Sequence, residues 1–168
     1  MKVIIAKSED EIATIESLAD EIWHEHFTPI IGVKQVEYML EKYQSSSVIR
    51  QQINSGHIYL LVQREGRNIG YASFLADSIH NNVQLSKFYL LNKQRDQGIG
   101  RLLMEHIETI CQQQHIHRIW LTVNRHNSGP IAAYKKMGFT QTGEVIQDIG
   151  SGYVMDDFIM EKRLSSTT

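Results

Sequence analysis

Two closely spaced glycines, Gly98 and Gly100, lie in the segment "QRDQGIGR", just before a stretch with helical periodicity. Glycine permits tight turns and lets a ligand approach the backbone N–H groups closely. The first N–H groups of a helix have no partner within the helix, and the helix dipole adds partial positive charge there. Arg95 and Arg101 flank the glycines and could add further charge. The segment therefore indicates a site for a phosphate or pyrophosphate.

Two common nucleotide motifs do not fit this segment. A Walker loop needs Lys and Ser or Thr after its last glycine, but Arg101 and Leu102 follow Gly100. A Rossmann fingerprint needs a small third residue, and Leu103 stands at that position. The alternative interpretation is a tight turn that binds nothing, because short glycine patterns are weak evidence.

A metal site is not expected in this chain. His24 and His26 flank Glu25 in "WHEHF", but the spacing is not that of His-Glu-x-x-His, and residues two apart do not share a helical face. His115 and His117 follow a predicted helix, where histidines interact favourably with the helix dipole, so we interpret them as structural.

The periodicity around these residues predicts a mixed α/β fold in a single domain over 1–164, with a frayed tail at 165–168. The predicted strands are 2–6, a hairpin over 57–77, 83–91, 118–123, 140–150 and 153–164. The first predicted helix begins at Ser8 and ends near 24–32, where Pro29 and Gly32 interrupt the pattern. A second helix contains 36–43, and a third covers 45–56. Two later helices run from the glycine segment to about Gln114 and over 129–139. This order places helices on both faces of a largely antiparallel sheet.

Bulk composition restricts the function classes. The net charge of -2 disfavours general binding to nucleic acid or to membrane surfaces. No run approaches the roughly 20 apolar residues that span a bilayer, and the start does not resemble a signal peptide. Cys111 is the only cysteine, so no internal disulfide can form. We therefore expect a cytoplasmic protein.

Two segments together resemble the GNAT superfamily of N-acetyltransferases. Residues 95–100 are similar to its Arg/Gln-x-x-Gly-x-Gly/Ala motif, and residues 127–139, "NSGPIAAYKKMGF", resemble its Asn-x-x-Ala-x-x-x-Tyr-x-x-x-Gly-Phe pattern. The matching offsets are Asn127, Tyr134, Gly138 and Phe139, while Pro130 replaces the usual alanine. One helix and one strand separate the two segments, as in the family. The predicted order of elements can be laid onto the family's fold.

The resemblance implies a donor site for acetyl-CoA where two adjacent parallel strands, 83–91 and 118–123, splay apart. The pantetheine arm would pair with the first strand, and the pyrophosphate would meet the N–H groups of 97–101. Asn127 would contact the arm, and Lys136 would reach the nucleotide end unless it is simply a solvated charge. The implied donor-binding residues are Phe88, Tyr89, Leu90, Arg95, Asp96, Gln97, Gly98, Ile99, Gly100, Arg101, Asn127, Tyr134 and Lys136.

The implied reaction is direct transfer of the acetyl group to a primary amine. The backbone N–H of Phe88 would donate to the developing oxyanion. Tyr134 matches the family tyrosine that donates a proton to the departing thiolate. The alternative for Tyr134 is a core tyrosine on an amphipathic helix.

The resemblance does not identify the general base. Gln84 stands where histone-acetylating members carry a glutamate, and an amide cannot accept a proton at neutral pH. The candidates are Glu25 and Asp157, with His24, His26, Asp77, His80 and Asp156 as further possibilities. A chain of water molecules, or an amine that arrives neutral, would make such a base unnecessary.

The acceptor is expected to be a small cationic amine or a polyamine. The residues expected to contact it are Trp23, Glu25, His26, Phe27, Tyr153 and Asp156. Within the superfamily, the helical N-terminal segment and the C-terminal "MDDFIMEK" resemble the corresponding parts of bacterial spermidine/spermine N-acetyltransferases. The alternatives are a protein or peptide amine as acceptor, a non-catalytic acyl-CoA sensor, and a nucleotide-binding regulator, which the failed nucleotide motifs disfavour. A homodimer is consistent with the family.

Overall fold

A computed structural model describes residues 1–165, so the last part of the predicted frayed tail, 166–168, lies outside the described residues. The chain forms two compact units, Met1–Leu75 with Ser86–Leu103, and Ala76–Leu85 with the residues from Met104 onward. The expectation of one domain over 1–164 stays a prediction.

The elements follow the predicted order. The strands are β1 (Lys2–Ile5), β2 (Ile58–Arg64), β3 (Arg67–Asp77), β4 (Asn82–Leu90), β5 (Arg118–Asn124), β6 (Thr140–Gly150) and β7 (Tyr153–Arg163). The helices are α1 (Glu9–Ile31), α2 (Val33–Tyr43), α3 (Ser46–Asn54), the short η1 (Asn92–Gln94), α4 (Ile99–Gln113) and α5 (Ser128–Lys136).

In the first unit, α1 begins at the predicted capping box. Ser8 Oγ accepts from the N–H of Glu11 at 3.2 Å, and Glu11 Oε2 accepts from the N–H of Ser8 at 2.8 Å. The helix ends within the predicted segment 24–32: it continues past Pro29 to Ile31. Pro29 lies in its last turn, where the missing N–H removes a single bond. Gly32, at φ +82°, then ends the helix.

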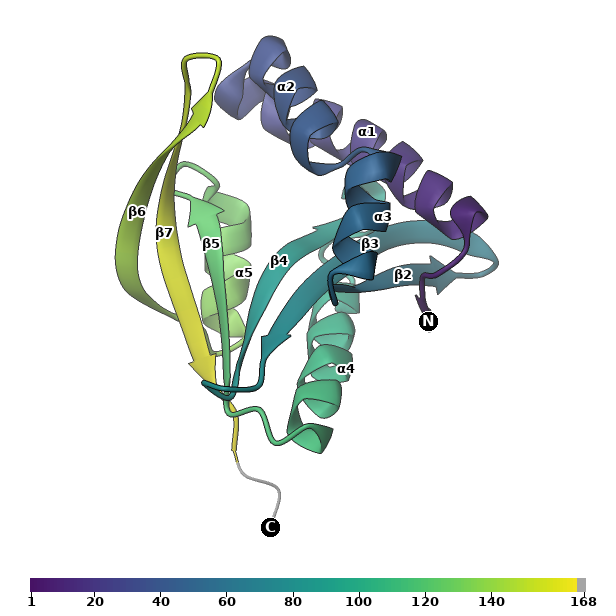
Figure 1. The fold of residues 1–168 in the computed structure, drawn as a ribbon, viewed down its shortest axis with the longest axis vertical. Coiled ribbons are helices and arrows are strands. Elements are labelled where there is room, and N and C mark those ends of the chain that lie inside the picture. Colours follow the sequence, from purple (N-terminus) through teal and green to yellow (C-terminus); the bar gives the residue numbers. More distant parts are fainter. Residues whose placement is uncertain (166–168) are drawn as a thin grey trace. The chain divides into compact units, whose positions relative to one another are not determined.

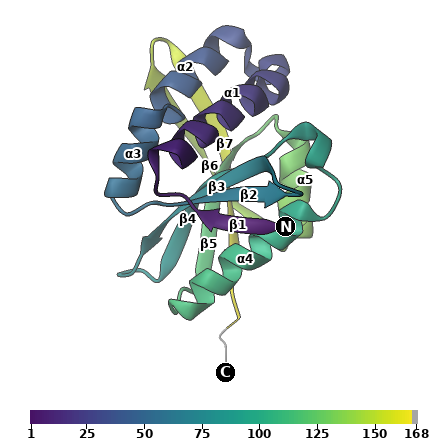
Figure 2. The same cartoon turned by 90° about the vertical axis from the view of Figure 1, so that its right-hand side faces the viewer.

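The apolar stripe of α1 faces the interior and includes Ile15, Ala19 and Ile22, all almost fully buried. Helices α1 and α2 lie side by side (Figures 1 and 2). β1 pairs antiparallel with β2, and β2 with β3. Next to β3 in the sheet lies β4, whose last residues lead into the glycine segment.

In the second unit, Asn82–Gln84 of β4 pair in parallel with Arg118–Trp120 of β5, and β5, β7 and β6 form an antiparallel series (Figure 1). The strand order is β1-β2-β3-β4-β5-β7-β6. The predicted α/β fold with a mixed, mostly antiparallel sheet is confirmed. None of the helices within residues 1–165 has both the length and the apolar character needed to cross a membrane.

Candidate active site

The backbone around Gly98 forms a row of free donors, which we call the N–H cradle and define as residues 96–101. Within the described residues, none of its N–H groups donates a hydrogen bond to the protein; Leu102 is the first to do so, to Gly98 O at 3.1 Å. Asp96 and Gly98 have positive φ angles of 60° and 77°. Orphan N–H groups at the start of a 15-residue helix suit an anion, as the sequence predicted.

The polar side chains around the cradle point to protein partners. Gln97 accepts a bond from Arg64 Nη1 at 2.6 Å and donates to Lys93 O at 2.9 Å. Arg95, expected to contact phosphate, instead donates to His26 Nδ1 at 2.9 Å and to Leu90 O at 3.2 Å. Arg101 is exposed. The cradle therefore presents mainly backbone donors, with Arg101 as the flanking charge.

Residues Phe88, Tyr89 and Leu90 end β4 immediately before this loop. The Phe88 ring lies beside Gly100, where an added Cβ would be 3.9 Å from Phe88 Cε1. Trp23 and Phe27, expected to contact the acceptor, are 5% and 7% exposed and stack at 4.2 Å between ring centroids. Their rings also meet Tyr89 at 5.7 Å and 6.3 Å. These two residues of α1 form an aromatic core with Tyr89 of β4 rather than an open surface.

In the second unit, Asn127 and Tyr134 are both buried on the segment that carries α5. Asn127 is the N-cap residue, and its carbonyl accepts from Ile131 N at 3.1 Å. The Tyr134 ring packs against Phe139, with centroids 5.6 Å apart. Burial raises the pKa of the Tyr134 phenol above its usual range, so the group stays protonated and remains a hydrogen-bond donor. Lys136 is exposed.

The two neighbouring aspartates of β7 have different environments. Asp156 forms an ion pair with Arg125, whose Nε lies 2.8 Å from Asp156 Oδ1. Asp157 is only 3% exposed. Burial, together with the charge of Asp156, raises the pKa of Asp157 to about 6, against the effect of a hydrogen bond from Thr122. Asp157 can therefore accept a proton near neutral pH, whereas the carboxylate of Asp156 is paired with Arg125.

The other predicted bases are less suited to proton transfer. Asp77 accepts bonds from the N–H groups of Ile79 and His80 and from the His80 ring, and these bonds lower its pKa. Glu25 is exposed and accepts from Asn92 Nδ2 at 3.3 Å. His24 Nδ1 lies 2.8 Å from the carbonyl oxygen of Asp20. Among the candidates, Asp157 alone is buried.

Sequence reasoning missed Lys87, which is 5% exposed. Its Nζ donates to Tyr43 O at 2.5 Å, to Tyr59 Oη at 2.6 Å and to Gln52 Oε1 at 3.3 Å. Burial without a carboxylate partner lowers its pKa to about 7. The signal was present in the sequence, because the alternation of β4 places Lys87 on the same face as Val83 and Leu85.

Lys87 gives a testable pH dependence of stability. Its folded-state pKa of about 7 lies below the ordinary value near 10.4, so the unfolded chain binds more protons between these limits. The free energy of unfolding should therefore rise with pH from about 7 to about 10, by roughly 4 kcal/mol. Urea unfolding at pH 7 and pH 9 measures the first part of this rise, about 2 kcal/mol. In Lys87→Met the rise should disappear, and an equal rise in that variant would contradict the assignment.

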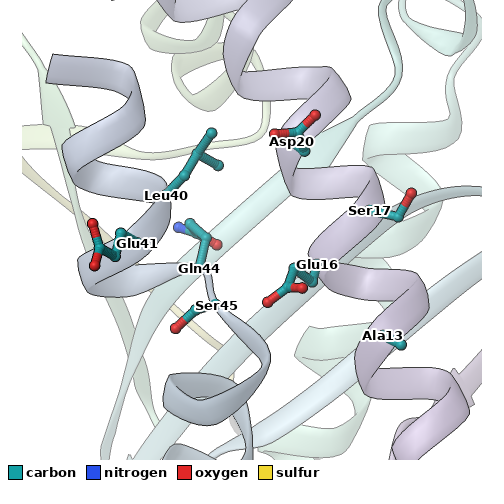
Figure 3. Close-up of a pocket in the computed structure, with 8 residues that line it drawn as sticks. All are labelled: Ala13, Glu16, Ser17, Asp20, Leu40, Glu41, Gln44 and Ser45. Atoms are coloured by element: carbon teal, nitrogen blue, oxygen red, sulfur yellow. The ribbon is translucent and has the colours of Figure 1, made fainter. Parts of the chain in front are cut away.

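A hollow of about 420 Å³ lies between α1 and α2 in the first unit (Figure 3). Its polar groups serve helix packing. Glu16 caps α3 by accepting a bond from the N–H of Ser46, and Gln44 Oε1 accepts from Tyr71 Oη at 2.9 Å. Asp20 and Glu41 add charge at its rim. We therefore assign this hollow to packing of the helices.

Comparison with known proteins decides the family. The sequence model of the Acetyltransferase (GNAT) family matches residues 15–139. The chain belongs to the GNAT family. It is thus an acetyl-CoA-dependent N-acetyltransferase, and the free donors of the N–H cradle fit the pyrophosphate of that donor. Within residues 1–165 no three His, Cys, Asp or Glu side chains are placed to hold a metal ion.

Relatives of this GNAT protein cover most of its length. An uncharacterized N-acetyltransferase of Mycobacterium tuberculosis is 26% identical over 81% of this chain and 86% of its own. The PaiA N-acetyltransferase of Thermoplasma acidophilum, solved with coenzyme A, has a TM-score of 0.78 at 24% identity, covering 97% and 99% of the two chains. A chimera of Vibrio cholerae spermidine N-acetyltransferase SpeG and hSSAT has a TM-score of 0.72 at 15% identity, covering 96% and 94%. These likenesses show the fold.

Proposed function

We propose that this acetyltransferase acts on a small cationic amine, with polyamines as the substrate class. The observation that carries the proposal is the pair of aspartates on β7, in which Asp156 is held by Arg125 and Asp157 is buried with a pKa near 6. A cationic amine must lose a proton before it attacks, and Asp157 is suited to accept it. The fold shared with a spermidine N-acetyltransferase is consistent with this class.

The donor would be held mainly by backbone. The N–H groups of residues 96–101 would bind the pyrophosphate, and Arg101 would add charge at the edge. The end of β4 at Phe88–Leu90 and the side chain of Asn127 would position the pantetheine arm, as the family resemblance implies. When bound, acetyl-CoA supplies the acetyl group as a thioester.

Four groups of the chain would then carry the reaction. Asp157 accepts a proton from the ammonium of the acceptor, and the backbone N–H of Phe88 donates to the carbonyl oxygen under attack. Tyr134 donates its phenol proton to the departing sulfur. Because burial keeps Tyr134 protonated, the donor state persists across the working pH range. Asn127 orients the donor and moves no proton.

A panel of amines tests the acceptor class. Spermidine, spermine, a short diamine, free lysine and a peptide with a free N-terminal alanine are compared by release of the coenzyme A thiol. We expect kcat/KM for the polyamines to exceed that for the peptide by about tenfold or more. A peptide preferred by the same margin would support a protein or peptide amine instead. Binding of acetyl-CoA without transfer to any amine would support the acyl-CoA sensor.

A further inference from the structure

Arg95 belongs to the glycine motif and immediately precedes the N–H cradle, and its side chain bonds to other parts of the protein. Its Nη1 lies 2.9 Å from His26 Nδ1 on α1, and its Nε donates to Leu90 O at 3.2 Å. Burial lowers the pKa of the guanidinium, while Glu25 and Asp96 favour its charged form. Arginine remains charged in proteins, so the group acts only as a donor.

This geometry assigns the roles in the Arg95–His26 contact. Because the arginine can only donate, His26 Nδ1 is the acceptor of this bond. The His26 ring also meets Phe27 edge-on, at 4.7 Å between centroids and 89° between planes. Phe27 in turn belongs to the aromatic core with Trp23 and Tyr89. The bond thus links the cradle to the packed part of α1.

A second bond runs in parallel with the first. Asn92 Nδ2, in the turn before the cradle, donates to Glu25 Oε1 at 3.3 Å. On its other side the loop is held by Arg64 of β2, which donates to Gln97. Hydrogen bonds therefore join the loop that carries the cradle to α1 through residues 92 and 95, and to β2 through residue 97.

From these contacts we propose that Arg95 is a positioning residue that couples occupancy of the cradle to α1, rather than a ligand of the pyrophosphate. Anion binding to the N–H groups reduces the motion of the loop. Through the Arg95–His26 bond, it also reduces the motion of the C-terminal half of α1. This deepens the proposed function, because α1 carries residues expected on the acceptor side. Binding of the donor would then prepare α1 for the amine.

Coenzyme A alone is a sufficient probe, so the test needs no acceptor. Its affinity is measured by calorimetry, and hydrogen exchange is followed in peptides covering residues 20–31 with and without coenzyme A. In the unaltered protein we expect exchange in 20–31 to slow by about threefold or more on binding. In Arg95→Gln we expect an affinity within about threefold of the unaltered protein and no slowing in 20–31.

Two further variants separate the coupling from other effects. His26→Phe keeps the ring contact with Phe27 but removes the acceptor, so it should reproduce the loss of slowing. Arg64→Gln is the matched control, because it removes a guanidinium bond to the same loop from β2, and it should keep the response of α1. Two results would overturn the proposal: slowing that persists in both Arg95→Gln and His26→Phe, or a loss of about tenfold in affinity confined to Arg95→Gln. Failure to find an acceptor amine bears on the proposed function alone.

Discussion

Replacement of Tyr134 by phenylalanine is expected to lower kcat by about 100-fold or more, the usual contribution of a positioned general acid. The phenol is buried, its pKa is raised above the usual range, and phenylalanine keeps the ring packing against Phe139. Affinity for acetyl-CoA should change little, because the cradle is formed by other residues. Steady-state kinetics with the preferred amine, together with calorimetry for acetyl-CoA, measures both quantities.

The matched control is Tyr71→Phe. Tyr71 is also buried and loses a hydrogen bond in the variant, the one its phenol donates to Gln44 at 2.9 Å. Loss of this hydrogen bond should lower the free energy of unfolding by about 1 kcal/mol and leave kcat within about threefold of that of the unaltered enzyme. Full turnover in Tyr134→Phe across the pH range would remove this residue from the acid role.

Replacement of Asp157 by asparagine is expected to lower kcat/KM by about 100-fold or more, because an amide cannot accept the proton. In the unaltered enzyme, kcat/KM should rise with pH through about 6, the pKa to which burial raises this carboxyl. The variant should lack this rise. A pH profile of kcat/KM from pH 5 to pH 8 measures the difference.

Asp156→Asn is the control for Asp157, since it alters the neighbouring charge and leaves the proposed base in place. The charge of Asp156 raises the pKa of Asp157, so its removal should lower that pKa. In Asp156→Asn the rise in kcat/KM should therefore persist but occur at a lower pH. A rise that stays near pH 6 in Asp157→Asn would assign the acid limb to another group.

The stability of Asp157→Asn separates chemistry from folding. The folded pKa of about 6 lies above the ordinary value near 3.9, so the free energy of unfolding of the unaltered protein should fall as pH rises from about 4 to about 6. Asparagine has no such titration. The variant should therefore be no less stable at pH 8, and its loss of activity cannot then be ascribed to unfolding.

The sequence by itself determined the order of the elements and the family, and it predicts that the glycine turn binds an anion. The capping box at Ser8 and Glu11, the alternation of β4 and the glycines at 98 and 100 act through neighbours a few residues away, so local pattern is enough to identify them. The end of α1 before Gly32 also follows from the sequence, because glycine readily adopts the positive φ that terminates a helix.

Only the tertiary structure decided what each charged side chain does. The sequence places Arg95 in the glycine motif, whereas its partner His26 comes from α1, and the two side chains approach only in the folded chain. Asp156 and Asp157 are adjacent and chemically identical, yet one meets Arg125 and the other is buried. Lys87 differs from the other lysines only in the folded chain, where residues of α2, α3 and β2 surround its ammonium group. The physical reason is that burial and long-range partners, which set pKa and hydrogen bonding, exist only in the folded chain.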